Sequence, residues 1–214
     1  MAATAHRYSP ELLAFHGVRV LGSPSVEAVA RRFRLAAGDV REAFLDAQAR
    51  GWVTRHEFFG DVTWSMTQAG KLEEERLLAE ELDAVGAREL VAAAHADFLP
   101  LNTLHGQACT RWQLRPTSWD PAGRNDHTDL RWDAAVLDDL ERADRGLAEA
   151  CGRLAAALTR FEGHAEAHHA ALERVRHGDG AWLDAPGRDS CQLVWIQFHE
   201  DLLATLGIPR GTDT

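Results

Sequence analysis

The sequence predicts a mainly α protein with one small β-hairpin, in which a compact N-terminal part is followed by a C-terminal helical bundle. Apolar residues recur at intervals of three and four along most of the 214 residues, which is the helical period. Two short runs rich in β-branched and aromatic residues flank a polar turn, which is typical of a hairpin. Hydrophobic residues make up 45% of the chain, which is enough for buried cores.

Three helices are expected in the N-terminal part. The first runs from Pro10 to Leu21, the second from Ser25 to Phe33, and the third from about Gly38 to Arg50. Gly51 fits the left-handed position that often follows a helix. The buried face of the third helix consists of residues spaced four and three apart, namely Val40, Phe44 and Ala47.

A hairpin is expected next. Trp52–Thr54 and Val62–Met66 are β-rich, and the polar stretch from Arg55 to Asp61, with Gly60 near its end, predicts the turn between them. Thr67 suits the N-cap of a following helix. Three helices and a hairpin in this order predict a winged helix-turn-helix over residues 1–70, with the hairpin as the wing.

In such a fold the second helix of the helix-turn-helix motif enters the major groove of double-stranded DNA. In this chain it is the third helix, from about Gly38 to Arg50. Residues 1–70 carry 8 basic and 7 acidic side chains, whereas the whole chain has a net charge of −10, so the arginines must be focused on one face to bind phosphate. A solvated helix face and a protein-interaction module remain the alternatives. The candidate DNA-binding residues lie around the turn, on the third helix and on the wing: Arg31, Arg32, Arg34, Arg41, Gln48, Arg55 and His56.

The N-terminal part resembles the winged-helix domains of the MarR and PadR-like bacterial transcription regulators. The resemblance lies in Arg-Gly-Trp-Val at residues 50–53 and in the aromatic-x-Met-Thr-x-x-Gly pattern from Trp64 to Gly70. It implies a DNA-binding transcription regulator. Winged-helix proteins of this size usually read two half-sites, so a homodimer is expected.

The remaining chain predicts helices almost throughout. Residues 71–96 are expected to form one connecting helix, and residues 97–214 a helical effector-binding and dimerisation domain. Within that domain, a helix is expected to start at Pro100 and a loop to cover residues 116–132. An apolar stripe from Leu137 to Phe161, broken only by Asp144, needs a partner helix. The last two helices are expected at Glu166–Arg176 and about Asp189–Leu206.

Two tryptophans and several polar groups in this domain predict a pocket for a small-molecule effector, because such pockets combine apolar walls with a few orienting polar atoms. Helix capping, a satisfied core histidine and a core tryptophan are the structural alternatives. The domain also resembles the C-terminal helical region of actinobacterial winged-helix regulators, in 98–102, 112–113, 125–127 and 195–203, a resemblance that names no ligand. The candidate effector-binding residues are Trp112, Gln113, Asn125, Asp126, His127, Trp195 and His199.

Enzymatic activity, a cofactor and a bound metal are not expected, because metalloprotease, C-x-x-C and phosphate-loop motifs are missing. His127, His199, Glu200 and Asp201, together with His105 and Cys109 one turn apart, are nevertheless possible metal ligands. A metal-responsive regulator or a metal-dependent enzyme therefore stays an alternative. His164, His168 and His169 are expected on a solvated helix. The three cysteines are expected to pack as small apolar groups.

Without an apolar run of membrane-spanning length or a signal peptide, a cytoplasmic location away from membranes is expected.

Overall fold

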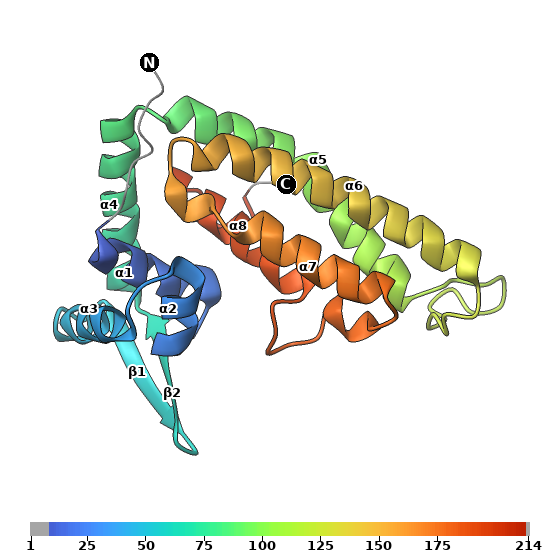
Figure 1. The fold of residues 1–214 in the computed structure, drawn as a ribbon, viewed down its shortest axis with the longest axis horizontal. Coiled ribbons are helices and arrows are strands. Elements are labelled where there is room, and N and C mark those ends of the chain that lie inside the picture. The colour runs from blue at the N-terminus through green and yellow to red at the C-terminus, as the bar shows by residue number, and fades with distance from the viewer. Residues whose placement is uncertain (1–8, 213–214) are drawn as a thin grey trace. The chain divides into compact units, whose positions relative to one another are not determined.

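The computed structural model describes residues 9–212 and confirms a mainly α protein with one hairpin (Figure 1). The chain divides into two compact units. Unit 1 consists of Met1–Ala92, Leu154–Glu162 and Gln197–Thr214, and unit 2 of Ala93–Arg153 and Gly163–Ile196. The N-terminal unit therefore extends past residue 70 and takes in two later segments, which the sequence places in the helical domain.

The first three helices of unit 1 are α1 (Pro10–Leu21), α2 (Val26–Phe33) and α3 (Ala37–Ala49), as the sequence predicts. The Ser25 hydroxyl accepts a hydrogen bond from the Ala28 backbone N–H at 3.2 Å, which caps the start of α2. Gly51 has a φ of +74° after α3, as expected for a glycine at a helix end. The core shared by these helices and the hairpin contains Ala14, Phe15, Val18, Val29, Val40, Phe44 and Trp64.

The hairpin is formed by β1 (Val53–Phe58) and β2 (Asp61–Met66), which pair antiparallel from Val53 with Met66 to Phe58 with Asp61. Its turn consists of Phe59 and Gly60 alone, with φ values of +49° and +90°. The predicted turn from Arg55 to Asp61 is therefore wrong. Polar residues at 55–57 continue β1 because both faces of this part of the strand are exposed to water.

Helix α4 (Gln68–Val85) follows the hairpin, capped by the Thr67 hydroxyl, which accepts from the Gly70 N–H at 3.0 Å. Gly70 packs directly against the Trp52 carbonyl, where a Cβ atom would collide with the backbone. The single helix predicted over 71–96 is wrong, because Gly86 adopts a left-handed conformation with φ +65° and ends α4. Helix α5 (Arg88–Gln113) begins two residues later.

Pro100 lies inside α5 and does not begin a helix, so the start predicted there is wrong. A loop over residues 114–129 leads to α6 (Leu130–Ala155), the 3₁₀ turn η1 (Thr159–Phe161), α7 (His164–Arg176), the 3₁₀ turn η2 (Gly180–Trp182) and α8 (Cys191–Leu206). Much of the apolar stripe on α6 is fully buried, including Leu140, Leu147 and Leu154. In the part of the chain that the structure describes, no helix is long and apolar enough to cross a membrane.

Candidate nucleic-acid interface

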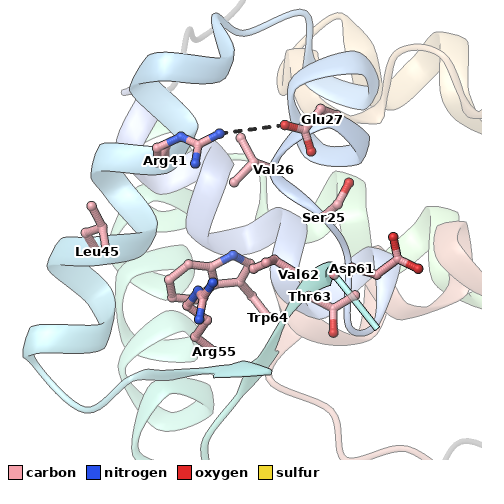
Figure 2. A pocket seen from close by; sticks show the side chains of 11 residues that line it. Ser25, Val26, Glu27, Arg41, Leu45, Arg55, Asp61, Val62, Thr63 and Trp64 are labelled. Atoms are coloured by element: carbon pink, nitrogen blue, oxygen red, sulfur yellow. Dashed lines mark ion pairs between the residues drawn. The ribbon is translucent and has the colours of Figure 1, made fainter. Parts of the chain in front are cut away.

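A groove of about 620 Å³ lies between the start of α2, one flank of α3 and the hairpin (Figure 2). Its lining is Ser25, Val26, Glu27, Arg41, Leu45, Arg55 and residues 60–64. Trp64 holds the hairpin against α3, because its ring lies 5.2 Å from that of Phe44 and its backbone N–H bonds to the Pro24 carbonyl at 3.0 Å. The sequence order of helix, helix and hairpin thus folds into a concave surface.

The α3 flank that lines this groove carries Arg41 and Leu45, and Gln48 is exposed one turn after them. Figure 2 shows Arg41 pointing toward Glu27, and the nearest nitrogen and oxygen atoms are 3.7 Å apart. Both side chains are nearly two-thirds exposed, so this ion pair contributes about 0–1 kcal/mol. Arg41 can exchange this carboxylate for another anion at little cost.

The hairpin contributes two further predicted residues. Arg55 lies on β1 and pairs with Glu57 at 2.8 Å, with both side chains exposed. His56 bonds across the hairpin to the Ser65 hydroxyl at 2.7 Å. Trp64 lines the same groove, and its buried indole N–H has no acceptor within residues 9–212. A buried donor without an acceptor carries a desolvation cost, which the packing of the Trp64 ring against Phe44 must offset.

The three arginines predicted around the helix turn differ in their surroundings. Arg32 donates to the backbone carbonyls of Glu162 at 2.8 Å and Arg160 at 3.2 Å, so the fold of unit 1 already uses its guanidinium. Arg34 is exposed, with its nearest carboxylate, Glu162, 3.7 Å away. Arg31 is exposed, and its guanidinium makes a long hydrogen bond of 3.5 Å to the Glu27 carbonyl. Arg31 and Arg34 therefore remain available at the surface, whereas Arg32 has a structural role that the sequence does not reveal.

Unit 1 also contains a buried ion cluster, which joins α1 and α4 to η1 and α8. His16 Nδ1 lies 2.7 Å from Glu74 and its Nε2 lies 3.0 Å from Asp201. Arg160 bonds to Asp201 at 3.2 Å and to Glu81 at 2.9 Å, and its third nitrogen donates to a hydroxyl. The members of the buried ion cluster are His16, Arg19, Glu74, Glu75, Glu81, Arg160, Glu200, Asp201 and Thr205.

Electrostatics fix the charge of His16. Burial lowers the pKa of its imidazole, but the carboxylates of Asp201 and Glu74 outweigh burial and raise the pKa to about 10. Protonated His16 then donates from both ring nitrogens. The cluster explains why Glu200 and Asp201, which the sequence offers as metal ligands, lie on an apolar helix: they pair with cations of α1 and η1.

The predicted effector residues of the loop before α6 bond to one another. Asn125 donates to the Trp112 carbonyl at 3.0 Å and to Asp133 at 2.8 Å, and His127 lies 3.0 Å from Asp133 and against the Trp112 ring. Gln113 donates to Asp184. Asp126 and Asp129 accept backbone N–H bonds two and three residues ahead, as the capping alternative predicts. These groups hold the loop in place.

Trp195 packs in a different part of unit 2. Its ring lies parallel to that of His105, with centroids 4.2 Å apart, and its N–H donates to Asn102 at 2.9 Å. It is buried, which matches the core-tryptophan alternative. Trp195 packs against His105 and Trp112 against His127, so the two tryptophan rings have different neighbours, and the effector pocket stays a prediction. His199 is half-buried and belongs to unit 1.

A chain of polar contacts runs through the interior beside Trp195. His168 lies 2.7 Å from Asp144 and 3.4 Å from His105, whose other nitrogen is 3.6 Å from the Cys109 sulfur. Burial, with a smaller effect of His168, lowers the pKa of His105 to about 3, and burial raises that of Cys109 to about 12, so both stay neutral. The solvated helix predicted for the three histidines is wrong for His164 and His168, which are buried, and correct for His169. Within residues 9–212, no three histidine, cysteine or acidic side chains are arranged to hold a metal.

Comparison with known proteins identifies no relative, since no protein family, curated protein or solved structure matches this chain. The geometry of unit 1 defines its class: three helices followed by a two-stranded antiparallel hairpin, a winged-helix-like arrangement.

Proposed function

We propose that this chain is a DNA-binding transcription regulator in which α3 enters the major groove of duplex DNA and the hairpin contacts the duplex beside it. The groove between α2, α3 and the hairpin carries this proposal, because it brings the guanidinium groups of Arg41 and Arg55 to one concave surface. In a helix-turn-helix protein, that helix reads base edges while the flanking elements contact phosphates.

The charges of the groove favour binding that depends strongly on salt and on orientation. Glu27 and Asp61 lie in the same groove, and the chain as a whole carries a net charge of −10. Phosphate would therefore be repelled by most of the surface and attracted only where exposed arginines exchange their weak partners.

A homodimer is part of the same proposal. Two copies related by a two-fold axis would place two α3 helices about one DNA turn apart, roughly 34–36 Å. Exposed apolar side chains such as Leu72 on α4 and Leu130 at the start of α6 are candidates for the contact between copies. Light scattering of the intact chain is expected to give about twice the monomer mass of 23.6 kDa, and a monomer on and off DNA would contradict this part.

The decisive experiment is selection of duplexes from a random library by the full chain, followed by gel-shift titration of the enriched sequence. We expect enrichment of a two-fold symmetric site. Arg41→Ala should reduce the preference for that site. Arg88→Ala is the matched control, since Arg88 is also an exposed arginine in unit 1, paired with Asp83 outside the groove. Failure to enrich any sequence, at low salt as well, would refute DNA recognition.

A further inference from the structure

The aromatic rings at the tip of the hairpin add little to the packing of unit 1. Phe58 is 73% exposed and Phe59 is 93% exposed. Their ring centroids lie 4.4 Å apart in an edge-to-face arrangement, so the two rings form one apolar projection. Large apolar groups grouped in this way gain from burial only by contact with another molecule.

The backbone at Phe59 is also unfavourable. Its φ of +49° is the left-handed conformation, and Gly60 follows with φ +90°. The first position of such a two-residue hairpin turn favours Asn, Asp or Gly, because a larger side chain crowds the neighbouring carbonyl oxygen. Asparagine would satisfy the turn better than phenylalanine. Strain at an exposed position that the fold does not require points to a role in binding.

The position of the tip relates it to the groove. Gly60, in the turn, lines the groove. Asp61, Arg55 and Arg41 line it as well (Figure 2). Strand β1 spans six residues from the buried Val53 to the tip, which is about 17–20 Å of extended chain. The hairpin therefore projects well beyond the three helices (Figure 1).

We propose that Phe58 and Phe59 form an apolar wedge that enters the minor groove next to the site read by α3, partly unstacks one base step and bends the duplex. This inference rests on the proposed function. Proteins that bind the minor groove use apolar side chains in this way. The charges near the tip offer phosphates no net attraction, because Glu57 pairs with Arg55 at 2.8 Å and Asp61 repels phosphate. The rings are then the attractive groups.

The test measures DNA bending by energy transfer between dyes at the two ends of the selected duplex, with the full chain bound. We expect the wild type to bend the duplex by on the order of 20–90°. The double variant Phe58→Ala, Phe59→Ala should leave the duplex straight and bind it about tenfold more weakly. Trp119→Ala, which removes an exposed aromatic side chain of unit 2, should bend and bind the duplex as the wild type does.

A second variant separates binding from folding. Phe59→Asn suits the left-handed turn, so its melting temperature should equal or exceed that of the wild type while the bend is lost. Equal bending by the wild type and the double variant, or a straight duplex with both, overturns the wedge and leaves recognition by α3 intact. A lower melting temperature of Phe59→Asn assigns the ring to the fold and overturns it as well. If light scattering shows that the double variant loses a dimer, the rings bind a second copy instead of DNA. If selection yields no duplex, both proposals fall.

Discussion

Arg41 and Arg55 on the groove, and Arg19 and Arg160 in the buried ion cluster, lie in the same compact unit but differ in what surrounds them. The first pair is exposed, and each guanidinium has one exposed carboxylate nearby. Arg19 bonds to three carboxylates, and Arg160 is fully buried between two carboxylates and a hydroxyl. Arginines suited to bind phosphate are those whose present partners are weak and exposed, and the predictions below test this distinction.

The largest effect is expected for Arg160→Met, which keeps the bulk of the side chain but removes its charge. Asp201 and Glu81 would then be buried without this cation, and such a change costs about 3–5 kcal/mol. Arg41→Ala should change the free energy of unfolding by only about 0.5 kcal/mol or less, as surface substitutions do. Urea unfolding of both variants measures the difference. Equal stabilities would show that the cluster does not stabilise unit 1.

His16 should make stability depend on pH. Its pKa is about 10 in the folded chain against the ordinary 6.5, so its contribution is complete below pH 6.5 and is lost as pH rises toward 10. The loss between these limits should amount to a few kcal/mol. His16→Gln should be less stable at pH 6 and should lack this part of the decline. Unfolding free energies of both proteins at pH 6 and 9.5 give the result, and parallel declines would contradict a protonated His16.

Recognition at the groove gives the next effect. Arg41→Ala should lose about 1–3 kcal/mol of preference for the selected site over random duplex, since a base contact is worth that much. Arg55→Ala should weaken binding evenly across sequences and reduce the slope of log affinity against log salt by about one. Titrations at two salt concentrations distinguish the two roles. A loss of site preference in the Arg55 variant alone would move base recognition from α3 to the hairpin.

Local signals in the sequence were sufficient to predict most of the N-terminal fold. Ser25, Gly51 and Thr67 mark helix ends by their own chemistry, and the β-rich runs mark the hairpin. The break at Gly86 was also readable from a glycine in a helical pattern. Pro100 was misleading, because a proline typical of a first turn lies here within a long helix.

The buried ion cluster could not be predicted in the same way. His16 and Asp201 are 185 residues apart, and no local pattern indicates that their helices meet. Arg32 illustrates the same limit, since its carbonyl partners lie about 130 residues later. For His168 the sequence predicts a solvated position, but its partners Asp144 and His105 lie on other helices and it is buried between them. Exposure of a polar side chain depends on such distant contacts, and the sequence alone does not give them.

The smallest effect on stability is expected for Arg34→Ala. Arg34 is 80% exposed and its nearest carboxylate oxygen, on Glu162, is 3.7 Å away, so removing the pair should cost about 0–0.5 kcal/mol. Arg34 follows α2 in a left-handed conformation with φ +55°, at the turn of the helix-turn-helix, where a cation can contact phosphate without reading a base. The variant should therefore unfold at the same urea concentration as the wild type, bind all duplexes slightly more weakly, and show a salt slope lower by about one. Arg34→Lys, which keeps the charge, should restore the slope. Arg34→Ala could instead lower stability as Arg160→Met does. A distant, exposed carboxylate such as Glu162 would then not be a valid sign that an arginine is available to bind DNA.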